Sequence, residues 1–283
     1  MTDDIDCDAL GALIQADART RGAPISKLGY FCAPFRPADG PFADRVIKVY
    51  RSMPDPAALD LLVARHDEYV AALRTTGVPM PQTTITLLVI DGTRIPVIVQ
   101  DALPATSMMR HLMQTGSRNE TLGYMQAAGE VIAAFWNNVD ALGGRIGFHP
   151  SIRNFAIVEG RAVFFDSFPP LIGYSRDEMG RMLLQFSEKR LMRVVGPLMQ
   201  ARVTGIQDEW YSAPETLVGL VGSACRLRPD DAQAYLDWGR GFMQASMPRW
   251  EHEARPGLEV APRLPGYWTG FRKLLGLQGE PNV

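Results

Sequence analysis

Apolar residues are spaced differently in the first hundred residues and in the rest of the chain. The first part contains four short β-prone runs bounded by turn residues, and a helix with one apolar face is expected from residue 54 to residue 75. The strand-like runs are residues 26–35, 43–51, 83–90 and 94–100. The dipeptide Asp91-Gly92 separates the last two runs and predicts a tight hairpin. With a short amphipathic helix in 1–20, this pattern predicts a small β-rich unit.

Beyond residue 105 the period of the apolar residues is that of helices. Helices are expected at 106–114, 119–142, 176–204, 213–226 and 230–247, before a Pro- and Gly-rich tail at 254–283 that contains one helical segment, WTGFRKLLGL. The stretch GFHPSIRNFAIVEGRAVFFDSF, residues 147–168, interrupts them with two short apolar runs around Glu159-Gly160, which predicts a second hairpin. The predicted fold class is α+β, with two lobes. A β-rich N-lobe at 1–100 is joined by a hinge at 101–104 to a helical C-lobe at 105–283.

Composition limits the partners that such a protein can have. Hydrophobic residues make up 46% and charged residues 21%, and the formal net charge is −2, so no global field attracts nucleic acid or an anionic membrane. The three cysteines are far apart and form no C-x-x-C pair, which favours a reducing cytoplasm over disulfides or a zinc site. The acidic start lacks the features of a signal peptide, and no run of about 18 apolar residues predicts a membrane span.

Three polar residues stand beside apolar runs, where charge is costly. Lys48 interrupts the run VIKVY; a lone strand lysine is usually a surface residue, but a rigid strand can also hold a cation against a bound phosphate. Asn154 precedes the second hairpin and Asp166 ends it, so strand pairing would bring the two side chains together. An amide oxygen and a carboxylate at one point suit Mg²⁺, which keeps several waters and binds phosphates.

These motifs, in this order, resemble the protein-kinase-like fold in its small-molecule phosphotransferase branch, the relatives of aminoglycoside and choline kinases. RVIKVY resembles the lysine strand, and HDEYVAALRTTGVPMP resembles the helix that carries the acid paired with this lysine. RIPVIVQDALP resembles the strand and hinge on which adenine docks. HPSIRN and AVFFDSF resemble the catalytic loop and the strand of the metal-binding aspartate. The resemblance covers roughly residues 20–250 in the order of their elements.

The resemblance implies a role for each motif residue. Lys48 would contact the α- and β-phosphates of ATP, and Asn154 and Asp166 would hold Mg²⁺. Gln100 and Ala102, at the end of the hinge strand, would line the nucleotide site.

The same resemblance makes Glu68 the acid that pairs with Lys48 at the nucleotide. On an ideal helix, however, Glu68 lies about 240° around the axis from Leu62, away from the apolar face. Asp67 and His66 point nearer the core, so the identity of the acid stays open.

Two departures from the family pattern bear on catalysis. No G-x-G-x-x-G occurs near 25–40, so the phosphate-covering loop must be rebuilt or absent. The position five residues before Asn154, where the family has its catalytic aspartate, is His149. A neutral imidazole can accept a proton, which makes His149 a candidate general base. Alternatively, the catalytic position is lost, or His149 only braces the loop.

The sequence favours an ATP- and Mg²⁺-dependent phosphotransferase, or a related nucleotide-dependent transferase, that acts on a small cytoplasmic metabolite. The alternative is a catalytically silent pseudokinase that serves as a nucleotide-binding or scaffold protein and has a protein partner. Neither nucleic acid nor a membrane is expected as a partner. Whether the protein is an enzyme depends on His149, and no cluster in the C-lobe identifies the acceptor.

Overall fold

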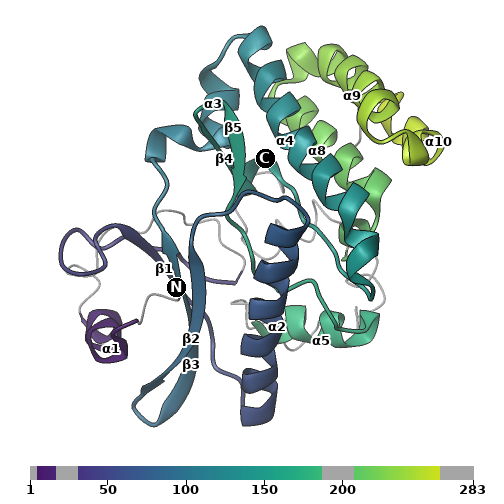
Figure 1. Ribbon diagram of the computed structural model, residues 1–283. Helices are drawn as coiled ribbons and strands as arrows, with labels where there is room; N and C mark the ends of the chain where they lie inside the picture. Colours follow the sequence, from purple (N-terminus) through teal and green to yellow (C-terminus); the bar gives the residue numbers. More distant parts are fainter. Residues whose placement is uncertain (1–4, 17–30, 187–206, 262–283) are drawn as a thin grey trace.

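The computed structural model describes residues 5–16, 31–186 and 207–261 and contains helices and small antiparallel sheets (Figure 1). The larger sheet consists of β1 (Arg45–Val49), β2 (Thr83–Ile90) and β3 (Thr93–Asp101), in the order β1-β3-β2. The predicted hairpin of β2 and β3 is confirmed. Asp91 and Gly92 have φ values of 51° and 73°, the positive values that this two-residue turn requires.

Different helices cover the two faces of this sheet. Because alternate side chains of a strand point to opposite faces, Val97 and Val99 of β3 lie on one side and Ile98 on the other. Val97 and Val99 belong to the buried cluster that contains the apolar residues of α1 (Cys7–Gln15). Ile98 belongs to the larger buried cluster, with the apolar face of α2 (Pro56–Thr75). The sheet is therefore covered by a helix on each face (Figure 1).

The rest of the described chain is mainly helical, as the apolar period predicted, so the α+β class is confirmed. The α-helices of this part are α3 (Met109–Thr115), α4 (Arg118–Asn138), α5 (Arg176–Phe186), α8 (Ala213–Leu227), α9 (Ala232–Ser246) and α10 (Glu251–Ala254). Short 3-10 turns span Ala105–Ser107, Val139–Leu142, Ile152–Asn154, Glu209–Tyr211, Pro229–Asp231, Pro248–Trp250 and Arg255–Leu258. Within the residues that the structure describes, no helix has the length and apolar character needed to cross a membrane.

The second predicted hairpin is also confirmed and lies between the sheet and the helices. It consists of β4 (Phe155–Val158) and β5 (Arg161–Phe164). The Phe164 N–H donates a 2.8 Å hydrogen bond to the carbonyl of Pro79, in the segment between α2 and β2. On the other side, the Phe164 ring packs against that of Phe148 at 4.8 Å between centroids. These contacts fix the ends of the hairpin relative to both parts of the molecule.

Some predicted elements differ from the structure or lie outside the described residues. Of the run expected at 26–35, the structure describes residues 31–35, and among these Phe35 alone shows strand pairing, in an isolated bridge with Ile47, since the neighbouring Pro34 has no N–H to extend a ladder. Three expected segments lie outside the described residues: 26–30, residues 187–204 of the helix expected at 176–204, and WTGFRKLLGL.

Candidate functional site

Lys48 lies in the middle of β1 and is buried, with 7% of the residue exposed. Its Nζ donates a 2.8 Å hydrogen bond to the backbone carbonyl of Phe165, just beyond β5. Burial lowers the pKa of the Lys48 ammonium, and the nearby Asp166 carboxylate opposes this shift. Since an ammonium has three N–H donors, the bond to Phe165 leaves donors for a ligand.

Asp166 follows β5 by two residues, and the backbone before it is held in place. The Phe165 N–H donates a 3.0 Å hydrogen bond to the carbonyl of Asn154, which continues the hairpin pairing past the strand ends. The Asp166 carboxylate interacts electrostatically with Lys48 and His149 and favours the charged form of both. Within the described residues, no hydrogen bond or ion pair engages this carboxylate. Its neighbours are fixed, and in the described part of the chain its oxygens accept no hydrogen bond.

Asn154 lies in a 3-10 turn directly before β4 and is 9% exposed. Its Nδ2 donates a 3.0 Å hydrogen bond to the carbonyl of His149. This bond fixes the amide so that Oδ1, the oxygen acceptor, is left for another partner. The backbone of Asn154 pairs with that of Phe165, the residue before Asp166, so the two ends of the hairpin lie side by side.

His149 lies on the loop before this turn, and its ring packs against the indole of Trp210 with 4.6 Å between centroids. Burial lowers the pKa of the His149 imidazole, Arg153 lowers it further, and Asp166 raises it. The net lowering favours the neutral ring at pH 7, and a neutral ring can accept a proton. We call Lys48, His149, Asn154 and Asp166 the Asp166 cluster.

Glu68 does not join the Asp166 cluster, and the expected pair between Glu68 and Lys48 is not formed. Glu68 is exposed and accepts a 2.6 Å hydrogen bond from Arg65 Nη1, one helical turn earlier. The reason is the helical phase: the inward position on α2 belongs to His66, which is fully buried.

Gln100 and Ala102 lie where the hinge strand was expected, but groups of both are already engaged. The buried Gln100 side chain donates from Nε2 to Thr83 Oγ1 at 2.8 Å. The Ala102 N–H donates to the carbonyl of Asp44 at 2.9 Å. In this arrangement the Ala102 N–H is not available to an adenine ring.

Two contacts that the sequence analysis missed connect α2 with the Asp166 cluster. His66 Nε2 lies 2.9 Å from Ser167 Oγ, and the Tyr69 hydroxyl donates a 3.1 Å hydrogen bond to the carbonyl of Gly147. The helical spacing of His66 and Tyr69 placed both on the apolar face of α2, which was a usable signal. Ser167 gave none, because nothing in the sequence connects it with α2.

The Asp166 cluster contains a carboxylate and an amide oxygen, which are ligand types that Mg²⁺ accepts. Mg²⁺ is often bound through one or two protein oxygens together with phosphates and water, so Asp166 with Asn154 Oδ1 would suffice. Among the described residues there is no group of three or more His, Cys, Asp or Glu that could hold a metal by itself. The oxygens of Asp166 and Asn154 therefore suit a metal ion that is also bound by a phosphate.

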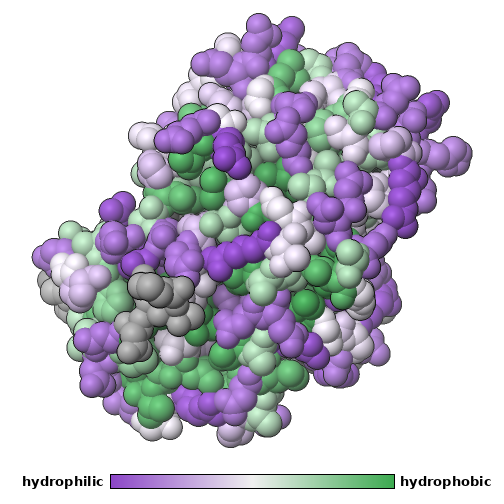
Figure 2. All heavy atoms as spheres, viewed as in Figure 1, coloured by the Kyte–Doolittle hydropathy of each residue, from purple (hydrophilic) through white to green (hydrophobic). Residues whose placement is uncertain are grey.

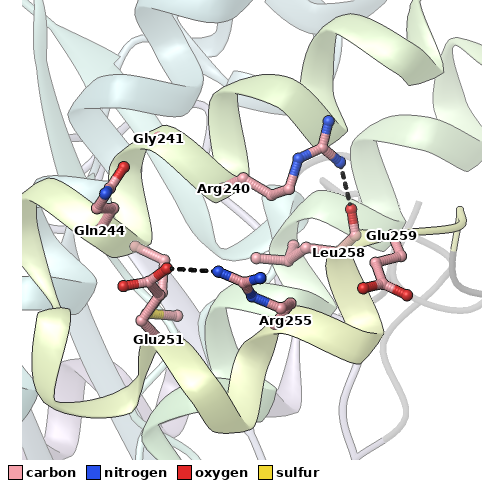
Figure 3. A pocket seen from close by; sticks show the side chains of 8 residues that line it. Arg240, Gly241, Gln244, Glu251, Arg255, Leu258 and Glu259 are labelled. Atoms are coloured by element: carbon pink, nitrogen blue, oxygen red, sulfur yellow. Dashed lines mark hydrogen bonds and ion pairs between the residues drawn. The ribbon is translucent and has the colours of Figure 1, made fainter.

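A second polar region lies on the helices farther along the chain. A hollow of about 470 Å³ is lined by residues of α9, α10 and the turn after α10 (Figure 3). Within it, Arg255 pairs with Glu251 at 3.1 Å, and Arg240 donates to the carbonyl of Leu258 at 2.7 Å (Figure 3). We call this the α9–α10 hollow. Arg240 also pairs with Asp237 on α9, and no residue that lines the hollow belongs to the Asp166 cluster.

The described residues thus form an α+β protein in which a buried strand lysine meets the end of a short hairpin. The chain belongs to a family of unknown function (DUF6206), whose family model matches residues 9–279. No curated protein matches its sequence. Since the family has no assigned activity, a functional assignment has to come from the geometry of the Asp166 cluster.

Proposed function

We propose that the protein is a kinase-like phosphotransferase that binds ATP with Mg²⁺ between two lobes and phosphorylates a small-molecule acceptor. The observation that supports this most strongly is the Asp166 carboxylate. It interacts with the buried cation of Lys48 and with His149, and no hydrogen bond within the described residues occupies it. A partly buried carboxylate that served stability alone would be expected to satisfy its oxygens with hydrogen bonds.

The residues divide into those that bind phosphate and those that hold the metal. Lys48 donates from Nζ to the α- and β-phosphate oxygens, held by the rigid β1 strand. Asp166 and Asn154 Oδ1 would hold Mg²⁺, and the Asn154 amide is oriented by its bond to the carbonyl of His149. When bound, Mg²⁺ supplies positive charge to the phosphates.

His149 acts as the general base in this proposal. Its lowered pKa keeps the ring neutral at pH 7, and the ring accepts the proton of the acceptor hydroxyl as that oxygen attacks the γ-phosphorus. The bond from the γ-phosphorus to the bridging oxygen breaks, and ADP leaves with the electron pair. Packing against Trp210 fixes the plane of the imidazole.

Two observations favour a second candidate, a pseudokinase that binds nucleotide without turnover. His149 packs on Trp210 and brings no negative charge to orient an acceptor, and Lys48 is bonded to a carbonyl instead of an acid. In that case the Asp166 cluster binds Mg²⁺ and nucleotide and signals occupancy to a protein partner.

Calorimetric titration of ATP in the presence of Mg²⁺ and in the presence of EDTA tests the proposal. We expect Mg²⁺-dependent binding in the wild type, its loss in Asp166→Asn, and its retention in Asp177→Asn, a matched change at an exposed position of α5. Equal binding by all three proteins, or no binding by any, would contradict the site.

Turnover is measured next, by phosphorus NMR on ATP with a panel of hydroxylated and amino metabolites. ADP formation that depends on one acceptor class supports the phosphotransferase. Tight Mg²⁺-dependent binding without ADP formation across the panel selects the pseudokinase.

A further inference from the structure

The helix α2 directs a histidine toward the Asp166 cluster where the sequence led us to expect an acid. His66 is fully buried among the apolar residues of α2, two residues before the exposed Glu68. A buried polar side chain inside an apolar face costs free energy unless it is hydrogen-bonded. The partner that His66 has found therefore indicates what the side chain does.

That partner is the residue next to Asp166. His66 Nε2 lies 2.9 Å from Ser167 Oγ, and both residues are 0% exposed. The other ring nitrogen, Nδ1, is buried without a hydrogen-bond partner in the described residues, and the closest carboxylate oxygen, on Asp67, is 4.0 Å away. Within the described residues the imidazole thus makes one hydrogen bond, and its partner is the residue directly after Asp166.

The residue on the other side of Asp166 is held as well. The Phe165 carbonyl accepts from Lys48 Nζ at 2.8 Å, and the Phe165 N–H donates to the Asn154 carbonyl at 3.0 Å. Asp166 therefore lies between two anchored neighbours: one is bonded to β1 and to the turn before β4, and the other is bonded to α2. Within the described residues its carboxylate is the unengaged group at the centre of this arrangement.

We infer that His66 positions Asp166 for metal binding through the His66–Ser167 hydrogen bond. His66 does not touch the ligand in this account; it acts through Ser167 and is a positioning residue. A neutral hydrogen bond between buried groups takes the place of the ion pair expected between α2 and Lys48. This inference rests on the proposed function for its metal, but the link itself is a property of the ligand-free protein.

The test uses substitutions that differ in reach. A glutamine amide extends about as far as imidazole Nε2, whereas an asparagine amide reaches only to the position of Nδ1. We expect His66→Asn and Ser167→Ala each to raise the Mg²⁺ concentration that half-saturates ATP binding by roughly tenfold. This factor is equivalent to about 1.4 kcal/mol, the contribution of one hydrogen bond. The double variant should be no weaker than either single one, because both changes remove the same link. His66→Gln should recover most of the loss seen in His66→Asn.

A matched control separates positioning from stability. Thr121→Val removes another fully buried hydroxyl, which accepts a 2.8 Å hydrogen bond from Tyr235 on α9. It should lower the urea midpoint of unfolding and leave the Mg²⁺ half-saturation unchanged. If His66→Asn and Ser167→Ala behave like this control, or if their effects on Mg²⁺ add, the inference is overturned.

A second readout needs no ligand and distinguishes failure of this inference from failure of the proposed function. The carboxyl ¹³C resonance of Asp166, assigned by its loss in Asp166→Asn, is compared in ligand-free wild type, Ser167→Ala and His66→Asn. We expect both variants to shift it in the same direction and His66→Gln to shift it less. An unmoved resonance overturns the positioning role, whether or not the protein binds ATP; a shifted resonance in a protein that binds no nucleotide supports the link and rejects the phosphotransferase.

Discussion

The Asp166 cluster and the α9–α10 hollow both contain several polar and charged side chains, but these side chains differ in burial and in pairing. In the hollow, Arg255 and Glu251 pair with each other on partly exposed helix positions. Hydrophilic residues also cover most of the face shown over α9 and α10 (Figure 2). In the Asp166 cluster, Lys48 is buried, its ammonium bonds to a carbonyl, and the nearby carboxylate of Asp166 has no hydrogen bond in the described residues.

The difference is the reason that the proposed function is placed at the Asp166 cluster and not at the α9–α10 hollow. Exposed ion pairs contribute little to folding and cost little to keep. A buried ammonium whose pKa is lowered by desolvation destabilises the fold, so another property has to account for it. We therefore expect substitutions in the Asp166 cluster to affect activity and substitutions in the hollow to affect neither activity nor stability appreciably.

The largest effect is expected at His149. If the protein is a phosphotransferase, His149→Ala should lower kcat by about 10²–10⁴, the usual contribution of a general base, with little change in the Kd of ATP. Because burial lowers the pKa of His149, the acid limb of the kcat profile should lie below the ordinary imidazole pKa of about 6.5. A profile that is flat from pH 8 to pH 5, or an Ala variant that loses only stability, would rule out the base.

The next effect is expected at Lys48. Lys48→Met should weaken ATP binding roughly tenfold or more by removing a charge-assisted hydrogen bond to phosphate. Its effect on the free energy of unfolding should stay below about 1 kcal/mol, because the lost bond to Phe165 and the relief from burying a charge act in opposite directions. Calorimetric titration and urea unfolding measure the two quantities. A large loss of stability with unchanged ATP affinity would show that Lys48 is structural.

A smaller effect concerns the pH dependence of stability and His66. Burial lowers the pKa of His66; Lys48 on β1 lowers it further, and Asp67 on α2 raises it. Below about pH 6.5 the unfolded chain therefore binds more protons at His66 than the folded protein does. The contribution of His66 to the free energy of unfolding is present above that pH and is lost as the pH falls toward the lowered folded-state pKa. Urea midpoints at pH 7.5 and 5.5 should show a smaller loss in His66→Gln than in wild type. His111→Gln, at an exposed position of α3, should show the wild-type loss; equal losses in all three proteins would refute this account of His66.

The smallest effect is expected in the α9–α10 hollow. Arg255→Ala should change the free energy of unfolding by less than about 0.5 kcal/mol and should leave the Kd of ATP unchanged, because its ion pair with Glu251 is partly exposed. A marked loss of ATP binding in this variant would indicate that ATP binds at the hollow and not at the Asp166 cluster.

The sequence predicted the elements well where a local signal was available. Asp91-Gly92 and the turn at Glu159-Gly160 specified two hairpins, and the apolar period specified α2 and α4. No strand forms in residues 31–35 of the run expected at 26–35, because Pro34 and Pro37 cannot donate to a ladder on either side of the bridge of Phe35.

The site was predictable only as far as geometry follows from local sequence. Strand pairing placed Asn154 beside the end of β5, and the period of α2 showed that Glu68 points outward. Which groups meet across the molecule depends on tertiary packing. The contacts of Lys48 with Phe165 and of His66 with Ser167 join residues more than a hundred positions apart, beyond the reach of any local pattern.

A crystal structure with Mn²⁺ and a non-hydrolysable ATP analogue would locate the proposed site, because Mn²⁺ takes the same oxygen ligands as Mg²⁺ and is identified by anomalous scattering. We predict an anomalous peak within about 2.2 Å of an Asp166 carboxylate oxygen, with Asn154 Oδ1 as a second ligand and Lys48 Nζ on a phosphate. A peak at another place, or a nucleotide bound away from Lys48 and Asp166, would contradict the proposed function.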